Sequence, residues 1–456
     1  MRLLSILVVV WFALYANAVL AEDDFIVWAD ALKQEAMESG ISEATATDTL
    51  NHIALLPDVI KLDHSQPEFI SPFLEYYYQR VDAKKIARGR ALLSLHETLL
   101  NKLEIQYGVP KALLVAFWGM ETNYGDYQGN IDTLSTLATL AYDGRRASFF
   151  RNQLLDAMRM IDSGNASLSD FRGSWAGAFG NMQFMPSTFM AYAVDGDGDQ
   201  YIDIVNSMPD AFASAANYLS QAGWHAGELA MIEVKLPENF DWQSAQLNLK
   251  KPVADWDSLG VRGVAEVIGV DGRGAAPPVV NVKRVVTKKM KLHQHVNPVH
   301  KKDTLKKVHA SQSHLLTTSS ISYTNVKLVN ASASAAILLP QGWHGPAFMV
   351  FDNFDVIMDW NRSVNYALSV LQLAKRINQE SRIVGGQSAE AGALTFQQML
   401  ELQSLLNLRG FDVGEPDGFP GLQTQAAIRA YQLSKHLPAD GYASPSLLNG
   451  ILSELP

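Results

Sequence analysis

The strongest constraint on the fold is a helical pattern that covers almost half of the chain. Between Phe25 and about Ala230, apolar residues recur at spacings of three and four, and glycine or proline separates successive segments. Three segments of this kind are Phe25–Ser39, Val81–Gln106 and Ala147–Ile161. Because strand signals are scarce in this region, the pattern predicts a mainly helical body.

The pattern changes near Met231. The segments that follow are short, β-branched and interrupted by glycine and proline, namely Glu233–Pro237, Val261–Gly274 and Pro277–Val286. They predict a small sheet appended to the helical body. Ala336–Phe354 is again strand-like and turn-like, and Asn361–Ile377 is typical of an amphipathic helix.

Composition excludes several classes of protein. The 456 residues are 48% apolar and include no cysteine. Disulfide scaffolds, cysteine-ligated zinc, iron–sulfur clusters, thiol nucleophiles and a lipid anchor on an N-terminal cysteine are therefore excluded. A net charge of −10 argues against a nucleic-acid partner. Nothing in the sequence indicates an organic cofactor.

Residues 1–21 are typical of a secretory signal peptide. Arg2 precedes an apolar run from Leu3 to Leu20, and small residues stand at Ala18 and Ala21. We expect cleavage after one of these alanines and a soluble mature protein outside the cytoplasm. The alternative is an uncleaved anchor, because about 18 apolar residues can just span a bilayer.

A basic insertion covers about residues 283–334. Its first part, Lys283–Lys307, contains nine lysines and arginines but one acidic residue, and four histidines lie in or beside it. We interpret it as an exposed insertion of the helical body. Attachment to an anionic polymer or membrane face and a histidine metal site are the alternatives. After residue 377, a Gly-, Ser- and Gln-rich linker over 378–392 leads to a separate small domain, 393–456.

The first candidate catalytic residue is Glu121. Pro110 suits the first turn of a helix, and the residues that follow it are apolar on nearly every side, so this helix should be buried. A carboxyl group at its end would be partly desolvated, which raises its pKa toward the range that a general acid needs. The alternative is a capping residue or a member of a core ion pair.

A second candidate site lies in the glycine-rich segment Gly173–Thr188. Its glycines allow a close approach of the backbone to a ligand, and Trp175, Phe179 and Phe184 offer rings that could stack on sugars. Gln183 offers both a donor and an acceptor. A plain connection between two helices is the alternative interpretation.

Together these segments resemble the lytic murein transglycosylase B family, glycoside hydrolase family 103. The shared motifs are Glu121-Thr-Asn-Tyr-Gly125, Gly173–Ser187, Tyr192–Asp199 and Ala215–Leu219. The similarity runs from about Asp24 to Ile377 outside the basic insertion. It implies a lysozyme-like helical core within a catalytic domain of residues 22–377, with the small sheet appended.

The resemblance also implies an activity. Family members cleave the β-1,4 bond between N-acetylmuramic acid and N-acetylglucosamine without water, and Glu121 would act first as acid and then as base to give a 1,6-anhydro end. Two alternatives are a hydrolytic muramidase and a non-catalytic peptidoglycan-binding protein. Hydrolysis would need a second carboxyl group about 5–9.5 Å away. Asp126 and Asp132 are available for that role, although surface or capping roles suit them better.

Other site residues follow from the same resemblance. Ser174 and Gln183 match residues that line the sugar cleft. Asn361 and Tyr366 match residues expected to bind sugar near the acid. Trp360 stands where tyrosine is usual, so its indole could stack on sugar, while any polar role at this position is in doubt.

An acidic loop predicts a calcium site. Its oxygen-bearing residues have the spacing of an EF-hand loop, at Asp195, Asp197, Asp199, Tyr201, Asp203 and Asn206. Gln200 replaces the usual glycine, and Asn206 cannot supply a bidentate carboxylate. The family carries an EF-hand-like site here, so Ca²⁺ is the expected ion, at reduced affinity. An acidic surface turn is the alternative.

The last domain resembles the peptidoglycan-binding type 1 domain, a three-helix module. Apolar residues at core spacing and turn glycines carry this resemblance, and Pro420 interrupts its usual Phe-Gly pair. Asp417 and Thr424 are its weak candidates for wall binding. The expected partner is therefore the peptidoglycan glycan strand, and other cell-wall enzymes are candidate protein partners.

Overall fold

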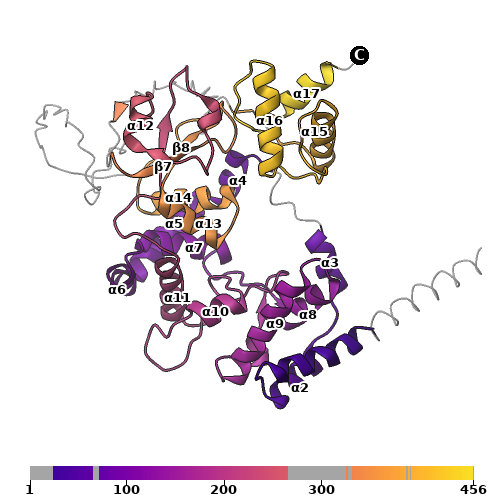
Figure 1. Cartoon of the computed structure of the whole chain (residues 1–456). Coiled ribbons are helices and arrows are strands. Elements are labelled where there is room, and N and C mark those ends of the chain that lie inside the picture. The colour runs from indigo at the N-terminus through magenta and orange to yellow at the C-terminus, as the bar shows by residue number, and fades with distance from the viewer. Residues whose placement is uncertain are drawn as a thin grey trace, which may run out of the picture.

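A computed structural model describes residues 24–64, 71–264, 325–326, 331–386, 389–390 and 392–454. The predicted signal peptide and most of the basic insertion lie outside these residues. Within the described ranges, none of the helices combines the length and the apolar character that a membrane crossing requires. Figure 1 shows the helical body, the small sheet and a separate C-terminal module.

The chain begins with a run of helices. Residues 24–38 are helical, and α2 to α6 follow at Glu43–His52, Pro57–His64, Phe73–Arg80, Ala83–Leu95 and Glu97–Tyr107. The segment predicted as one helix, Val81–Gln106, is thus two helices that meet at His96. Asp82 caps the first of them by accepting a hydrogen bond from the Lys85 amide at 2.7 Å.

The next helices form the centre of the body. They are α7 to α11, at Lys111–Thr122, Thr133–Asp143, Ala147–Asp162, Pro186–Tyr192 and Met208–Gln221. A two-stranded sheet pairs β1 (Ile131–Asp132) with β2 (Arg172–Gly173). Helix α7 is buried over most of its length because its residues are apolar on almost every side.

A six-stranded antiparallel sheet follows, in the order β4-β7-β8-β3-β5-β6. The strands in chain order are Met231–Lys235 (β3), Lys251–Pro252 (β4), Arg262–Val264 (β5), Asn325–Val326 (β6), Ser334–Leu338 (β7) and Ala347–Val350 (β8). All four residues of β8 are buried. Phe348 and Val350 join the helical core, whereas Ala347 and Met349 join a second core around Trp256 of α12 (Val253–Ser258). The strand therefore separates two apolar layers.

Two helices return the chain to the body, α13 (Asp352–Trp360) and α14 (Val364–Ile377). The sequence predicts helix from Asn361, but α14 begins later because the Ser363 hydroxyl caps it and accepts the Tyr366 amide hydrogen. Helix α13 begins within Ala336–Phe354, the segment that the sequence describes as strand-like and turn-like.

The segment after α14 is anchored at its start. Ile383 is buried in the main core, and the Glu233 carboxylate of β3 accepts hydrogen bonds from the amides of Val384 and Gly385. Burial raises the pKa of Glu233, while these two amides act in the opposite direction. We call this contact the Glu233 clasp. The beginning of the predicted linker thus belongs to the body.

The C-terminal module packs α15 (Phe396–Leu408), α16 (Leu422–Ser434) and α17 (Pro445–Ser453) around their own core. Leu394 belongs to this core and is buried. A mainly helical body, a small appended sheet and a separate three-helix module are the architecture predicted from the sequence, which is therefore confirmed.

Candidate active site

Glu121 lies on the last turn of α7, where the helix leaves the core. The preceding residues are buried, and Asn123 ends the helix in the left-handed conformation, with φ of 52°. The Glu121 side chain itself is partly exposed. The position expected from the sequence, at the end of a buried helix, is the position that the structure gives it.

Two side chains from distant parts of the chain donate hydrogen bonds to one oxygen of Glu121. The indole Nε1 of Trp360, on the last turn of α13, lies 2.9 Å from Oε1. The hydroxyl of Tyr366, on the first turn of α14, donates to the same oxygen. The pKa of Tyr366 is raised well above its usual value, mainly by burial and then by Glu121, so the phenol stays protonated and remains a donor.

Trp360 also supports the site through its ring. Its centroid lies 4.4 Å from Phe117, 5.0 Å from Tyr218 and 5.5 Å from Phe184. Rings on α7, on α11 and in the glycine-rich segment thus hold the indole in place. The sequence left a polar role at Trp360 in doubt, but the indole N–H reaches the carboxyl group directly.

The glycine-rich segment folds into a tight turn beside α7. Ser174 closes it through its backbone, which donates to the Ala178 carbonyl at 2.8 Å, and its hydroxyl accepts the Ala178 amide hydrogen at 3.2 Å. A Cβ atom at Gly173 would lie 2.0 Å from the Ala178 carbonyl oxygen. Glycine is required here because backbone meets backbone, and not only for access to a ligand.

The rings of this segment are less available than the sequence suggests. Phe179 and Phe184 are each only 2% exposed and belong to the main core. They pack on protein rings, so the expectation that they offer faces to sugars is wrong for both. Trp175 is half-buried.

Gln183 adopts a positive φ of 50°. Its Nε2 donates to the carbonyls of Gln128, at 3.0 Å, and Gly180, at 2.9 Å. A non-glycine residue in this conformation is uncommon and tends to occur at functional sites.

Asn181 connects the turn to α7 and to the acidic loop, and sequence reasoning did not identify it. Its Oδ1 accepts the indole hydrogen of Trp118 at 2.9 Å, and its carbonyl accepts the hydroxyl hydrogen of Thr122 at 3.0 Å. Its Nδ2 donates to the Val205 carbonyl at 2.7 Å. Asn181 lies within the Gly173–Ser187 motif, but nothing in the motif indicates a role for it. Its role depends on partners that are distant in the sequence.

The candidate second carboxyl groups have structural partners. Asp126 forms a bidentate ion pair with Arg88 and accepts a hydrogen bond from Asn123, and Arg88 lowers its pKa. Asp132 caps α8 and contacts His52 at 2.8 Å. These are the surface and capping roles that the sequence favoured for both residues.

Asn361 lies between Trp360 and the cap of α14. Its Oδ1 accepts the amide hydrogen of Ser363 at 3.0 Å. The amide group therefore contributes to the turn that places both donors on Glu121. Its predicted contact with sugar stays a prediction.

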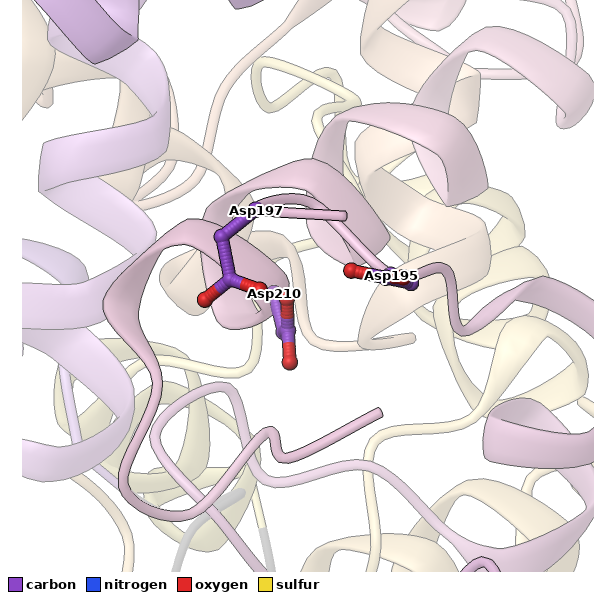
Figure 2. A group of neighbouring side chains, drawn as sticks. All are labelled: Asp195, Asp197 and Asp210. Carbon is purple, nitrogen blue, oxygen red and sulfur yellow. The ribbon is translucent and has the colours of Figure 1, made fainter. Parts of the chain in front are cut away.

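The acidic loop precedes α11 and forms a second candidate site, for a metal. Carboxylate oxygens of Asp195, Asp197 and Asp210 all lie within 4.8 Å of one another. Figure 2 shows these three side chains gathered beside the loop. Only the first two were predicted from the sequence; Asp210 lies beyond the twelve-residue loop, in the first turn of α11, so a search by EF-hand spacing could not find it.

The remaining predicted ligands make local contacts. Asp199 accepts the amide hydrogen of Tyr201 at 2.8 Å, and Asp203 accepts that of Asn206 at 2.8 Å. Neither Asp199 nor Asp203 belongs to the group of three. Among the acidic side chains, the structure thus groups Asp195 and Asp197 with Asp210 and not with Asp199 or Asp203.

Asp210 is nearly fully buried, at 1% exposure, beside two other acidic side chains. Burial is the main cause that raises its pKa, and Asp197 and Asp195 raise it further. Ca²⁺ prefers oxygen ligands such as carboxylates. The three aspartates supply such oxygens, so these residues fit this ion.

In the C-terminal module, Asp417 and Thr424 face inward to one residue, Gln403. Its Nε2 donates to Asp417 at 2.9 Å and to the hydroxyl of Thr424 at 3.0 Å. Thr424 is 3% exposed. Both residues therefore support the module's fold, and their predicted role in wall binding stays a prediction.

Comparison with known protein families gives two matches. The family described as Transglycosylase SLT domain matches residues 24–286 and 280–375. The family described as Putative peptidoglycan binding domain matches residues 397–450. The first match covers most of the chain, and the second covers the three-helix module.

Comparison with individual proteins agrees with the first of these families. The membrane-bound lytic murein transglycosylase B of Escherichia coli strain K12 is 34% identical over 161 residues, which are 35% of this chain and 44% of that protein. The match thus spans less than half of that relative's length.

Solved structures extend the likeness to nearly the whole chain. SltB3 from Pseudomonas aeruginosa, in complex with NAG-NAM-pentapeptide, is 36% identical, with a TM-score of 0.78 over 94% of this chain and 99% of its own. The Escherichia coli lytic transglycosylase Slt35, in complex with calcium, is 22% identical, with a TM-score of 0.56 over 76% and 92% of the two chains.

Proposed function

Since the chain belongs to the family of transglycosylases with the SLT domain, we propose that it cleaves peptidoglycan without water. The bond broken is the β-1,4 link between N-acetylmuramic acid and N-acetylglucosamine, and the product carries a 1,6-anhydromuramic acid end. One observation carries the proposal: the carboxyl group of Glu121 stands at the end of a buried helix and is oriented by Trp360 and Tyr366.

The chemistry needs one carboxyl group that acts twice. Glu121 first gives its proton to the glycosidic oxygen as the bond from C1 to that oxygen breaks. The resulting carboxylate then removes the proton of the muramoyl C6 hydroxyl, whose oxygen bonds to C1 and closes the anhydro ring. Trp360 and Tyr366 both donate to Oε1, so they hold this oxygen as an acceptor and fix the orientation of the carboxyl group.

The partners of Asp126 and Asp132 support this route over hydrolysis. A hydrolytic enzyme of this kind needs a second carboxyl group that is available to activate water or attack the sugar. Asp126 is paired with Arg88, and Asp132 caps a helix. We propose Ser174, Gln183 and Asn361 as ligands of the sugar, and Trp360 and Tyr366 as residues that orient the acid.

The decisive experiment is mass spectrometry of muropeptides that the mature protein releases from purified sacculi. We expect anhydro ends from the wild type and a loss of several orders of magnitude in the Glu121→Gln variant, because glutamine keeps the shape but cannot donate the proton. Reducing ends, heavier by one water, would show hydrolysis instead. Near-normal release by Glu121→Gln would reject the assignment of the acid.

We also propose that the acidic loop binds Ca²⁺ as a structural ion. Asp195, Asp197 and Asp210 would supply the carboxylate oxygens. The ion would offset the mutual repulsion of these groups and fix the end of the loop, which Asn181 joins to α7. In this proposal, calcium supports the geometry of the site and takes no part in the bond cleavage.

The C-terminal module would hold the protein on its substrate. Its match to a peptidoglycan-binding family supports this role. The predicted signal peptide and a cell-wall substrate support a periplasmic location for the mature protein. Cell fractionation, with an antibody to the native chain for detection, tests this location. Recovery of the protein in the cytoplasmic fraction would reject it.

A further inference from the structure

The C-terminal module is joined to the sheet through the turn between β7 and β8. The backbone amide of Trp343 donates to Oδ2 of Asp440 at 2.8 Å. A Cβ atom at Gly342, which has a φ of +69°, would lie 2.9 Å from that same oxygen and 3.1 Å from the Tyr442 ring. We call this contact, made by Gly342, Trp343, Asp440 and Tyr442, the seam.

A row of aromatic rings leads from the second core, around Trp256, to the seam. Trp256 is fully buried and lies 6.2 Å from Phe240, measured between ring centroids. Phe240 lies 5.4 Å from Trp242, and Trp242 lies 5.8 Å from Trp343. The last ring also contacts His344, at 3.5 Å.

The outermost ring is open to solvent although it is firmly held. Trp343 is 42% exposed, while its backbone is fixed by Asp440 and its indole contacts the rings of Trp242 and His344. Single exposed apolar side chains are common on protein surfaces, but this one differs from a free side chain because both its backbone and its ring are held. A ring that is already ordered loses little conformational entropy when a ligand packs on it.

We propose that Trp343, supported by Trp242, is a stacking subsite for the sugar rings of peptidoglycan, separate from the groups around Glu121. The flat apolar face of a pyranose ring fits the face of an indole, as aromatic side chains fit other flat apolar groups. The site lies where the peptidoglycan-binding module meets the transglycosylase body. A glycan strand that contacts both parts would therefore pass this ring. The inference rests on the proposed function for the identity of the substrate.

The test uses the full mature chain with Glu121→Gln, so that the ligand is not cleaved. The probe is peptide-free glycan strands from sacculi, and the measurement is the Kd by calorimetry. We expect Trp343→Ala to weaken binding about five- to tenfold. Phe149→Ala is the matched control, because Phe149 is 46% exposed but lies on α9, away from the seam; it should leave the Kd unchanged.

Two further variants separate stacking from a loosened seam. Trp343→Phe keeps a ring and should retain most of the affinity. Asp440→Ala removes the anchor of the turn without touching the ring. It should weaken strand binding less than Trp343→Ala does, because the ring is still present.

Several outcomes would overturn the subsite. They are an unchanged Kd in Trp343→Ala, an equal loss in Phe149→Ala, or no recovery in Trp343→Phe. If Trp343→Ala lowers the melting temperature markedly, its loss of binding could come from unfolding. Trp242→Ala is then measured in its place, and the same changes in Kd are expected. Failure of the proposed function is distinguishable, because it would show as absent anhydro products from the wild type, whereas failure of the subsite leaves those products intact.

Discussion

At the scale of single residues, the carboxyl group of Glu121 depends on partners that the sequence places far away. Trp360 and Tyr366 lie 239 and 245 positions along the chain from it. A hydrogen bond to a charged group contributes about 1.5–3 kcal/mol, so each donor should have a measurable effect on the acid.

Tyr366→Phe keeps the buried ring and removes only the hydroxyl. We expect kcat to fall by about ten- to a hundredfold with little change in KM, because the donor acts on the acid and not on the bound sugar. Steady-state release of anhydro products from a soluble glycan tests this. Tyr192→Phe is the control, since its ring packs on Tyr218 and not on Glu121. An equal loss of kcat in the control would contradict the role given to Tyr366.

The sequence could predict Glu121 but not its surroundings. An apolar helix closed by a carboxyl group is a local pattern, and the structure agrees with it. The donors on α13 and α14 and the link through Asn181 are long-range contacts, which depend on how the helices pack. Hydrophobic periodicity gives the buried face of each helix but not which residues of different helices meet.

At the scale of elements, the acidic loop shows how a local pattern can give an incomplete set of ligands. The EF-hand spacing identifies a loop that ends at Asn206, whereas the buried Asp210 comes from the helix that follows. The position of a helix relative to a loop depends on packing, here through the main core, to which α11 contributes Phe212.

This difference can be tested by calorimetry. We expect a chelator to lower the melting temperature of the wild type, because an ion that binds only the folded state stabilises it. Asp195→Ala and Asp210→Asn should abolish that shift, whereas Asp199→Asn should retain it. The opposite order for Asp210 and Asp199 would support the ligand set drawn from the sequence, and no shift in the wild type would reject the site.

The sheet was predictable only in part, for a similar reason. Short β-branched segments predicted strands; β5 lies within one of them, and β3 overlaps another but begins two residues before it, at Met231. Strand β8 lies within the strand-like segment Ala336–Phe354, although it is buried on both faces and lacks the alternation that marks a half-exposed strand. The break at His96 was also missed, because the apolar pattern continues across both helices.

At the scale of the whole molecule, the Glu233 clasp fixes where the body ends. The pKa of this buried carboxyl group is raised in the folded protein. A raised folded-state pKa means that the group favours folding most below its unfolded pKa, and this contribution is lost as the pH rises through the folded-state value.

The variant Glu233→Gln has no charge to lose. We therefore expect the melting temperature of Glu233→Gln, relative to that of the wild type, to increase as the pH rises from about 4 to 7. Melting curves across this range test the sign. A difference that is constant with pH would mean that the carboxyl group titrates alike in the folded and unfolded states.

Deleting residues 393–456 tests the division of labour between body and module. We expect weaker pelleting with purified sacculi and unchanged cleavage of soluble glycan, because Glu121 and its donors all lie in the body. The module has its own core, so its removal should leave the main core intact. Unchanged pelleting would remove the binding role.

The clasp also has a consequence for how the two parts work together. It holds Gly385 on the body, and Leu394 already belongs to the core of the module. The nine peptide steps between them span at most roughly 30 Å. Such a short tether keeps the module at an effective concentration on the order of millimolar near the β7–β8 turn, so the seam stays formed most of the time even if its contacts are of modest strength. Body and module would thus meet the same stretch of polymer, and the enzyme would remain attached between successive cuts.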